Sequence, residues 1–418
     1  MTEKLLQYIW QYQYFNGSDL VATSGDTIAV IYPGLLNANQ GPDFLQAHIK
    51  IGDTTLIGSV ELHIKTSDWQ KHQHSLDVNY RNVILHVVYQ NDAGLTVLPT
   101  VELESRISLH LLDRYAMLMA LHPTLACYRS ISQVDHLVWH SWKERLVVER
   151  LTRKTGRISS FLETNNFHWE EAFWWVLCRQ FGSTVNADAF EALARSVPIS
   201  ILAKHRGQIQ QIEALLLGQA NLLRGRFKDD YAKLLQREYR HLVKKCKLSP
   251  IHVPVYFLRM RPGNFPTLRL AQLAMLIFQT EHLFSKIIEA QTIAEIRKLF
   301  RLTANDYWHY RYRFDEPSPH KKKSLGNTTI DALLINAVIP MIFAYGNYHS
   351  DERQKLKAIQ WLEEVDAESN KITALFSAAS LPNKSAFDSQ AYLELKAQYC
   401  DPRRCLNCAV GGALLKME

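Results

Sequence analysis

The spacing of apolar residues changes near residue 110, and this change constrains the fold more than any other feature of the chain. Before it, short apolar runs alternate with Gly, Pro, Asn and Asp, which is typical of strands separated by turns. After it, apolar residues recur at intervals of three and four, which predicts helices. We therefore expect an α+β protein, with a mixed α/β domain over residues 1–110 and a larger all-helical domain over residues 111–418.

The first domain contains the predicted strands. A short helix is expected over residues 3–15, and strands are expected over residues 27–32, 44–51, 55–65, 82–89 and 95–103. The runs 44–51 and 55–65 are separated by Gly52-Asp53, which predicts a hairpin. The run 82–89 is continuously apolar, which indicates a strand that is buried on both faces.

Helical periodicity dominates the second domain. We expect helices over residues 114–121, 137–152, 169–181, 199–217, 229–242, 268–284, 293–300, 330–344 and 354–364. Loops rich in Pro and Gly separate several of these segments. The sequence has no internal repeat of fixed period, so a solenoid is not expected.

Charge and composition limit the class of partner only weakly. The formal net charge is +7, an excess that permits a polyanionic partner without requiring one. The N-terminus lacks the features of a signal peptide, and no uninterrupted apolar run approaches the roughly 18–20 residues of a spanning helix. We therefore expect a cytoplasmic protein with no membrane partner. The sequence does not indicate the oligomeric state.

Chemically active side chains gather on the predicted hairpin. Asp43 lies at the start of one strand, and Glu61, His63 and Lys65 alternate along the other. Because side chains alternate faces along a strand, these three share a face, and the hairpin can place Asp43 beside Glu61. Two adjacent carboxylates suit Mg²⁺ or Mn²⁺, which activates water and stabilises charge on a phosphate. His63 or Lys65 would then assist the attacking water.

This order of groups resembles the PD-(D/E)XK nuclease superfamily. The residues that carry the resemblance are Gly41-Pro42-Asp43-Phe44 and Val60-Glu61-Leu62-His63-Ile64-Lys65, after a leading helix that contains Glu3. The resemblance implies a restriction-endonuclease-like first domain, in which Asp43 and Glu61 hold the metal and Lys65 is the family's lysine. The sequence departs from the family pattern at His63, which occupies the usual lysine position. Either His63 or Lys65 therefore takes that role, or the site has lost catalysis.

The function implied by the resemblance is a metal-dependent nuclease or a nuclease-like nucleic-acid-processing protein. The alternative is a non-catalytic protein that binds nucleic acid or another protein through a degenerate nuclease fold. The residues alone also fit a simpler interpretation, in which Glu61, His63 and Lys65 form the solvated face of a half-buried strand. The whole chain also resembles an uncharacterised bacterial family of unknown function, which brings no activity with it.

Residues outside the hairpin are candidates for substrate binding. Four of them flank it in the sequence, namely Gln40, Ser67, His72 and His74. Two others, Arg237 and Lys244, share one face of a predicted basic helix that could follow a phosphate backbone. The alternative for all six is an exposed loop or a solvated helix face.

Three of the six cysteines lie within nine residues of one another. Cys400, Cys405 and Cys408 form the pattern C-x4-C-x2-C. Thiolates at this spacing can converge on zinc or on an iron–sulfur cluster, and some nucleases similar to this fold carry such a cluster. A fourth ligand would have to be a histidine or one of the other thiols, Cys127, Cys178 or Cys246. The alternative is that Cys405 and Cys408 pack as small apolar residues.

Overall fold

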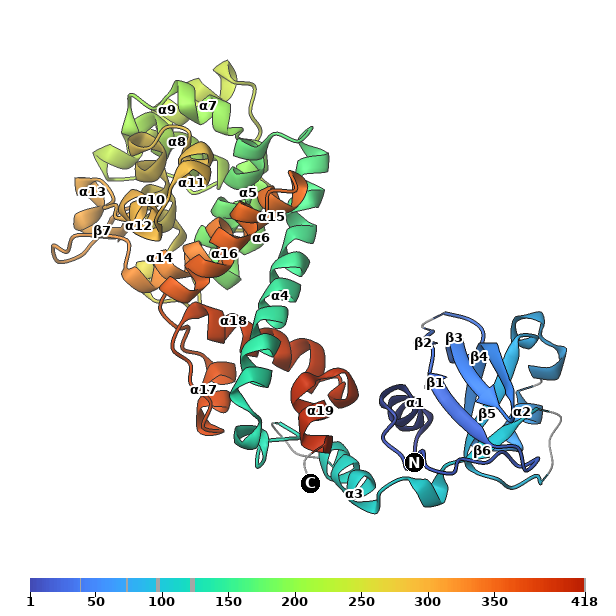
Figure 1. The fold of residues 1–418 in the computed structure, drawn as a ribbon. Coiled ribbons are helices and arrows are strands. Elements are labelled where there is room, and N and C mark those ends of the chain that lie inside the picture. Colours follow the sequence, from blue (N-terminus) through green and yellow to red (C-terminus); the bar gives the residue numbers. More distant parts are fainter. Residues whose placement is uncertain (38, 73, 95–97, 121–124, 417–418) are drawn as a thin grey trace. The chain divides into compact units, whose positions relative to one another are not determined.

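The computed structural model describes residues 1–418 except 38, 73, 95–97, 121–124 and 417–418. It divides the chain into two compact units (Figure 1). The sheet unit consists of Met1–Trp142 and Lys396–Glu418, and the helical unit consists of Lys143–Leu395. The fold class is α+β, as the sequence predicts, because a mixed sheet precedes a large helical region.

The sheet unit begins with a helix and a mixed sheet. Its elements are α1 (Glu3–Tyr12), β1 (Ile28–Tyr32), β2 (Leu35–Leu36), β3 (Phe44–Ile51), β4 (Thr54–Lys65), α2 (Asp68–Lys71), β5 (Val83–Gln90) and β6 (Thr100–Glu102). The strand order is β1-β3-β4-β5-β6, with β2 paired to β3. β1, β3 and β4 are antiparallel, whereas β4, β5 and β6 are parallel. The predicted hairpin is therefore confirmed. Part of the predicted strand 95–103 lies outside the described residues.

Helix α1 forms because its apolar residues share one face. Leu5, Leu6, Ile9 and Trp10 are buried, and the Thr2 hydroxyl caps the helix by accepting the N–H of Leu5. The helix packs against β4. Burying these four side chains stabilises the unit by about 1.5–3 kcal/mol each. The packing also fixes the polar side of α1 relative to the start of β3, where the candidate site lies.

The sheet unit is completed by helical segments from both of the chain segments that form it. They are α3 (Leu109–Met119), the first part of α4 (His136–Thr164), the π-helical turn η7 (Lys396–Cys400), the 3₁₀ turn η8 (Cys405–Asn407) and α19 (Ala409–Lys416). Helix α19 packs against α3. The predicted domain boundary near residue 110 falls at the start of α3, whereas the units divide within α4, after Trp142.

The helical unit contains the rest of α4 and most of the other helices. They are α5 (Trp169–Phe181), α6 (Ser183–Ser196), α7 (Ile199–Lys204), α8 (Ile209–Gln219), α9 (Asp230–Lys245), α10 (Pro266–Gln279), α11 (Leu283–Glu289), α12 (Ile293–Phe300), α13 (Asp306–His309), α14 (Asn327–Leu333), η6 (Leu334–Val338), α15 (Ile339–Tyr348), α16 (Glu352–Glu364), α17 (Lys371–Ala378) and α18 (Ala386–Leu395). The unit also has a two-stranded sheet, β7 (Arg311–Arg313) and β8 (Glu316–Pro317).

One helical stretch of this unit is apolar enough, by length and composition, to cross a membrane. Asn327–Tyr348 joins α14, η6 and α15 over 22 residues and has a mean hydropathy of 1.6. In the structure, 72% of its apolar window is buried inside the protein. This burial is typical of the core helix of a helical domain.

A buried carboxylate joins α8, α9 and α13. Glu213 is fully buried and accepts hydrogen bonds from the Tyr231 hydroxyl at 2.9 Å, the Asn305 amide at 2.5 Å and the Trp308 indole at 3.1 Å. Burial raises the pKa of Glu213 to about 7, although the three donors oppose the shift. The folded state therefore binds a proton at Glu213 more tightly than the unfolded state does.

The pKa of Glu213 predicts a pH-dependent loss of stability in the helical unit. Its folded pKa of about 7 lies above the ordinary value of 4.5, so stability falls as pH rises from about 4.5 to about 7. The loss amounts to roughly 3 kcal/mol at most. Glu213→Gln stays neutral and keeps an acceptor oxygen, so it should reduce the difference in melting temperature between pH 5 and pH 8. An unchanged pH profile in this variant would contradict the prediction. Glu363→Gln on the exposed face of α16 is the control.

Candidate metal centre and carboxylate cluster

Asp43 and Glu61 meet where β3 begins beside β4. Phe44 pairs with Val60, so the neighbouring acidic residues lie next to each other. The backbone N–H of Asp43 donates to Glu61 Oε2 at 3.0 Å, and the N–H of Leu62 donates to Asp43 Oδ2 at 3.1 Å. Each carboxylate is therefore held by the strand that carries the other.

The turn before β3 fixes the direction of Asp43. Gly41 has a φ of +111°, a conformation that favours glycine, and the Asn37 side chain donates to the Pro42 carbonyl at 2.9 Å. From α1, the Gln7 amide donates to Asp43 Oδ1 at 2.8 Å. Both oxygens of Asp43 therefore have donors, one from α1 and one from β4.

The carboxylates are poorly solvated and repel each other. Burial, above all, raises the pKa of Asp43 to about 6, and the charge of Glu3 on α1 adds to the shift. Burial raises the pKa of Glu61 to about 8, and the charge of Asp43 is the next cause. Because a bound cation would favour the charged form of each acid, the cluster has the electrostatics of a metal site.

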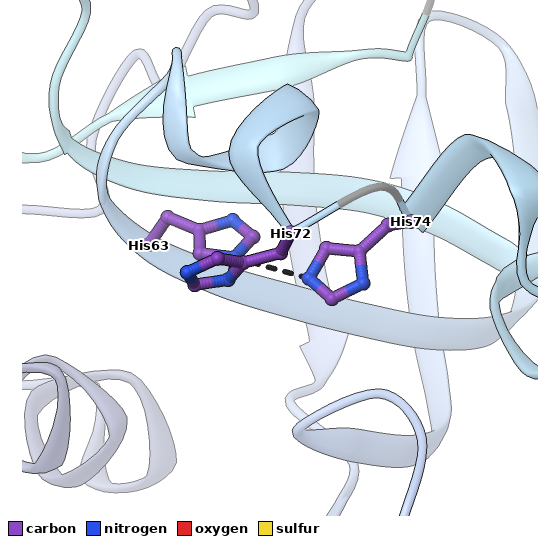
Figure 2. A group of neighbouring side chains, drawn as sticks. All are labelled: His63, His72 and His74. Carbon is purple, nitrogen blue, oxygen red and sulfur yellow. Dashed lines mark hydrogen bonds between the residues drawn. The ribbon is translucent and has the colours of Figure 1, made fainter.

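The imidazoles of His63 and His74 face the other oxygen of Glu61, and the imidazole of His72 lies beside them. Figure 2 shows His63, His72 and His74 with their rings turned toward one another. His63 on β4 is 1% exposed and His74 is 9% exposed, whereas His72 is exposed. One ring nitrogen of each histidine lies within 4.8 Å of the other two, which is close enough for a common metal ion.

Three of these ligand atoms form a nearly equilateral triangle. Glu61 Oε1 lies 3.6 Å from His63 Nε2 and 3.4 Å from His74 Nε2, and the two nitrogens are 3.3 Å apart. Bonds of about 2.0–2.1 Å in a tetrahedral zinc site place neighbouring ligand atoms about 3.4 Å apart. The triangle therefore has the size of one face of such a site. His72 Nδ1, 3.2 Å from His63 Nε2, is a further candidate ligand.

The buried imidazoles favour the neutral form that binds metals. Burial, followed by the neighbouring histidines, lowers the pKa of His63 to about 3, and burial also lowers the pKa of His74. His86 on β5 lies with its Nε2 2.9 Å from His63 Nδ1, and its own pKa is lowered to about 4, chiefly by burial. A hydrogen bond from the second ring nitrogen orients a metal-bound histidine, and His86 occupies that position.

Aromatic rings support the histidines from the loop after β4. Tyr80 stacks on His74 with ring centroids 3.9 Å apart. Trp69 on α2 contacts the rings of His63, His74 and His86, and its indole N–H donates to Ser75 Oγ at 3.0 Å. Packing on several sides limits the rotamers of His63 and His74, which is a requirement for a preformed site.

The structure rejects one interpretation of the hairpin. Glu61 and His63 are 5% and 1% exposed, so they do not form a solvated strand face. Lys65 is exposed at the end of β4, where its backbone N–H donates to Asp68. The role of Lys65 as the family's lysine remains a prediction.

The remaining predicted substrate-binding residues are not brought together. Gln40 is exposed in the turn before β3, and the Ser67 hydroxyl donates to Asp92 at 2.8 Å. Arg237 and Lys244 are exposed on α9, which belongs to the helical unit. Their contribution to substrate binding remains a prediction.

Sequence reasoning missed several residues of this site. Gln7, Tyr80 and His86 were not candidates, although His86 carried a signal. It interrupts an apolar strand that is buried on both faces, and a buried polar side chain requires a partner. Gln7 and Tyr80 lie on segments that pack against the hairpin, and no local sequence pattern indicates this packing.

The triangle predicts specific metal binding by the sheet unit. Zinc added to the metal-free protein should raise its melting temperature, with a gain of about 2.7 kcal/mol when free zinc is a hundredfold above Kd. Calorimetric titration should show tighter binding at pH 8 than at pH 6, because Glu61 must lose its proton to bind the ion. His63→Ala and His74→Ala should abolish binding.

His48→Ala is the matched control for these titrations. His48 lies on β3 of the same sheet and faces Tyr32 rather than the cluster. Its replacement should leave the metal affinity unchanged. Equal zinc affinity in wild type, His63→Ala and His74→Ala would refute this metal site.

Comparison with known proteins identifies a family, but no curated protein and no solved structure that matches the chain. The family model described as "Protein of unknown function (DUF2851)" matches residues 3–371. A search of curated proteins and a search of solved structures each found no match. The matched range contains the whole candidate metal centre, whereas the segment from Cys400 to Cys408 lies outside it.

Proposed function

Because the chain belongs to the DUF2851 family, whose description states no activity, we propose its function from the site: a metal-dependent nuclease. The ion is held by Glu61, His63 and His74, and the substrate is the phosphodiester backbone of a nucleic acid. The ligand triangle, with edges of 3.3–3.6 Å, is the observation that carries this proposal.

The ligand set favours a hydrolytic metal centre with an open coordination position. Two imidazoles and a carboxylate leave an open coordination position, as in catalytic zinc sites. Imidazole nitrogens favour zinc or a related transition ion over Mg²⁺, so the proposed cofactor differs from the Mg²⁺ or Mn²⁺ expected for Asp43 and Glu61 alone. A bound ion supplies an acidified water and neutralises charge on the phosphate.

Two further side chains act beside the ligands. Asp43 acts as the general base rather than as a ligand of the ion. Its pKa of about 6 lets it accept a proton from the attacking water near neutral pH. His86 orients His63 through the 2.9 Å contact between their ring nitrogens. Gln7 holds Asp43 in place through its hydrogen bond to Oδ1.

Nucleic acid is the substrate that the rest of the chain favours. The order of α1, the β3–β4 hairpin and the parallel strand β5 agrees with the resemblance to PD-(D/E)XK nucleases. The net charge of +7 and the exposed basic residues Arg237 and Lys244 on α9 suit a polyanion.

The non-catalytic alternative also has an observation in its favour. If His72 binds the ion together with the triangle, four protein ligands close the coordination sphere, as in structural zinc sites. The exposure of Lys65 also suits a fold that has lost catalysis. In this alternative the ion stabilises a module that binds nucleic acid or a protein.

Cleavage assays test the nuclease proposal directly. The full-length protein with Zn²⁺ or Mn²⁺ should cut single- or double-stranded DNA or RNA. Glu61→Gln and His63→Ala should lower the rate at least a hundredfold, because each removes a ligand of the ion. His48→Ala should cut as fast as the wild type.

Further variants assign the roles around the ion. Asp43→Asn should retain zinc binding in calorimetry and lose cleavage, which separates its proton transfer from metal binding. Lys65→Ala should retain most activity, because the exposed Lys65 is not a ligand of the ion. If the zinc-loaded protein cuts none of the substrates, catalysis is excluded and the closed-site alternative applies.

A further inference from the structure

Four of the six cysteines line one small apolar cavity in the sheet unit, away from the proposed nuclease site. Cys127, Cys400, Cys405 and Cys408 share this cavity with Leu118, Ala126, Tyr399 and Gly411. The sequence left the fourth ligand open. The structure selects Cys127, since Cys178 and Cys246 lie on or beside helices of the helical unit.

The C-terminal segment is folded tightly around this cavity. Cys400 ends η7, Cys405 begins η8, and Cys408 immediately precedes α19. A Cβ on Gly411 would lie 2.2 Å from the Cys405 carbonyl oxygen, so only glycine allows α19 to approach η8 this closely. The Arg403 guanidinium donates to the Ala120 carbonyl at 2.9 Å, which holds the segment beside the end of α3.

Backbone donors face one of the sulfurs. The N–H groups of Val410 and Gly411, at the start of α19, donate to Cys408. Donors of this kind orient and stabilise metal-bound thiolates. Cysteines that serve only as small apolar side chains do not need such donors.

Among the described residues that line the cavity, none carries a charged side chain beside the four thiols. All four cysteines are free rather than paired in disulfides. A thiophilic cation is the partner that would stabilise four thiolates at this site.

We propose that Cys127, Cys400, Cys405 and Cys408 together hold one thiophilic metal centre. Four thiolates can hold either an iron–sulfur cluster or a single zinc ion, and the cluster is the first of the two to test.

The centre would fasten the C-terminal segment to the residues after α3. Cys127 and Cys400 are separated by about 270 residues (400 minus 127), so the link closes a long loop of the unfolded chain. We therefore assign it a structural role in the sheet unit, independent of the reaction at Glu61 and His63.

Metal analysis of anaerobically purified full-length protein tests this proposal. Wild-type protein should contain iron and acid-labile sulfide and absorb broadly in the visible range. Cys127→Ser and Cys405→Ser should lose both iron and colour. Cys246→Ser, which changes a half-buried cysteine at the end of α9, should retain them. His63→Ala should also retain them, which separates this centre from the proposed nuclease site.

Other outcomes have defined meanings. The wild type could instead contain one zinc ion that Cys127→Ser and Cys405→Ser lose. This result would support the four-thiolate centre and show that it holds a single ion rather than a cluster. Equal metal content in wild type and Cys127→Ser would overturn the proposal, as would metal-free wild-type protein from cells supplied with iron and zinc.

A second measurement covers serine variants that fail to fold. Co²⁺ added to reduced, metal-free wild-type protein should produce the intense near-ultraviolet bands of sulfur–cobalt bonds, which histidine ligands do not give. The absence of these bands, with Co²⁺ binding still detected at the histidine cluster, would also overturn the proposal.

Discussion

The candidate site depends on one reciprocal interaction between two strands. The N–H of Asp43 binds the Glu61 carboxylate, and the N–H of Leu62 binds the Asp43 carboxylate. This exchange replaces part of the hydration that both acids lose on burial. It also uses one oxygen of Glu61 and directs the other toward His63 and His74. Without it, the strand register would place two buried acids together with only the Gln7 amide as a donor to Asp43.

Burial acts in opposite directions on the two kinds of ligand. It raises the pKa of Glu61 to about 8 and lowers that of His63 to about 3, so both groups favour their neutral forms at pH 7. An ion pair between them is therefore disfavoured. A metal ion removes this conflict, because it binds carboxylate and neutral imidazole together. The same logic applies to the four cysteine thiols, whose neutral forms are also favoured by loss of solvent.

Much of the fold follows from local pattern, whereas the sites depend on pairing between distant segments. Alternation and turn residues predicted the β3–β4 hairpin and placed Asp43 near Glu61. The triangle needed the loop after β4 to fold back, and the contact with His86 needed the parallel register that pairs Glu61 with His86. The periodicity of apolar residues along the chain indicates neither the fold of this loop nor the parallel register. The helix predicted over residues 199–217 is two helices, α7 and α8, because the polar residues between Lys204 and Ile209 interrupt it. Cys127 could be selected only once the C-terminal segment was seen to pack beside α3.

The division of the chain into units has a consequence for the order in which they fold. The helical unit is a continuous stretch of about 250 residues (143–395), inserted between two parts of the sheet unit. During synthesis, the strands and the Glu61 site emerge before the helical unit, and α19 emerges after it. Because domains fold as units while the chain is being made, the helical unit can fold before the sheet unit receives α19. Until then, the surface of α3 that receives α19 is exposed to other chains and to chaperones.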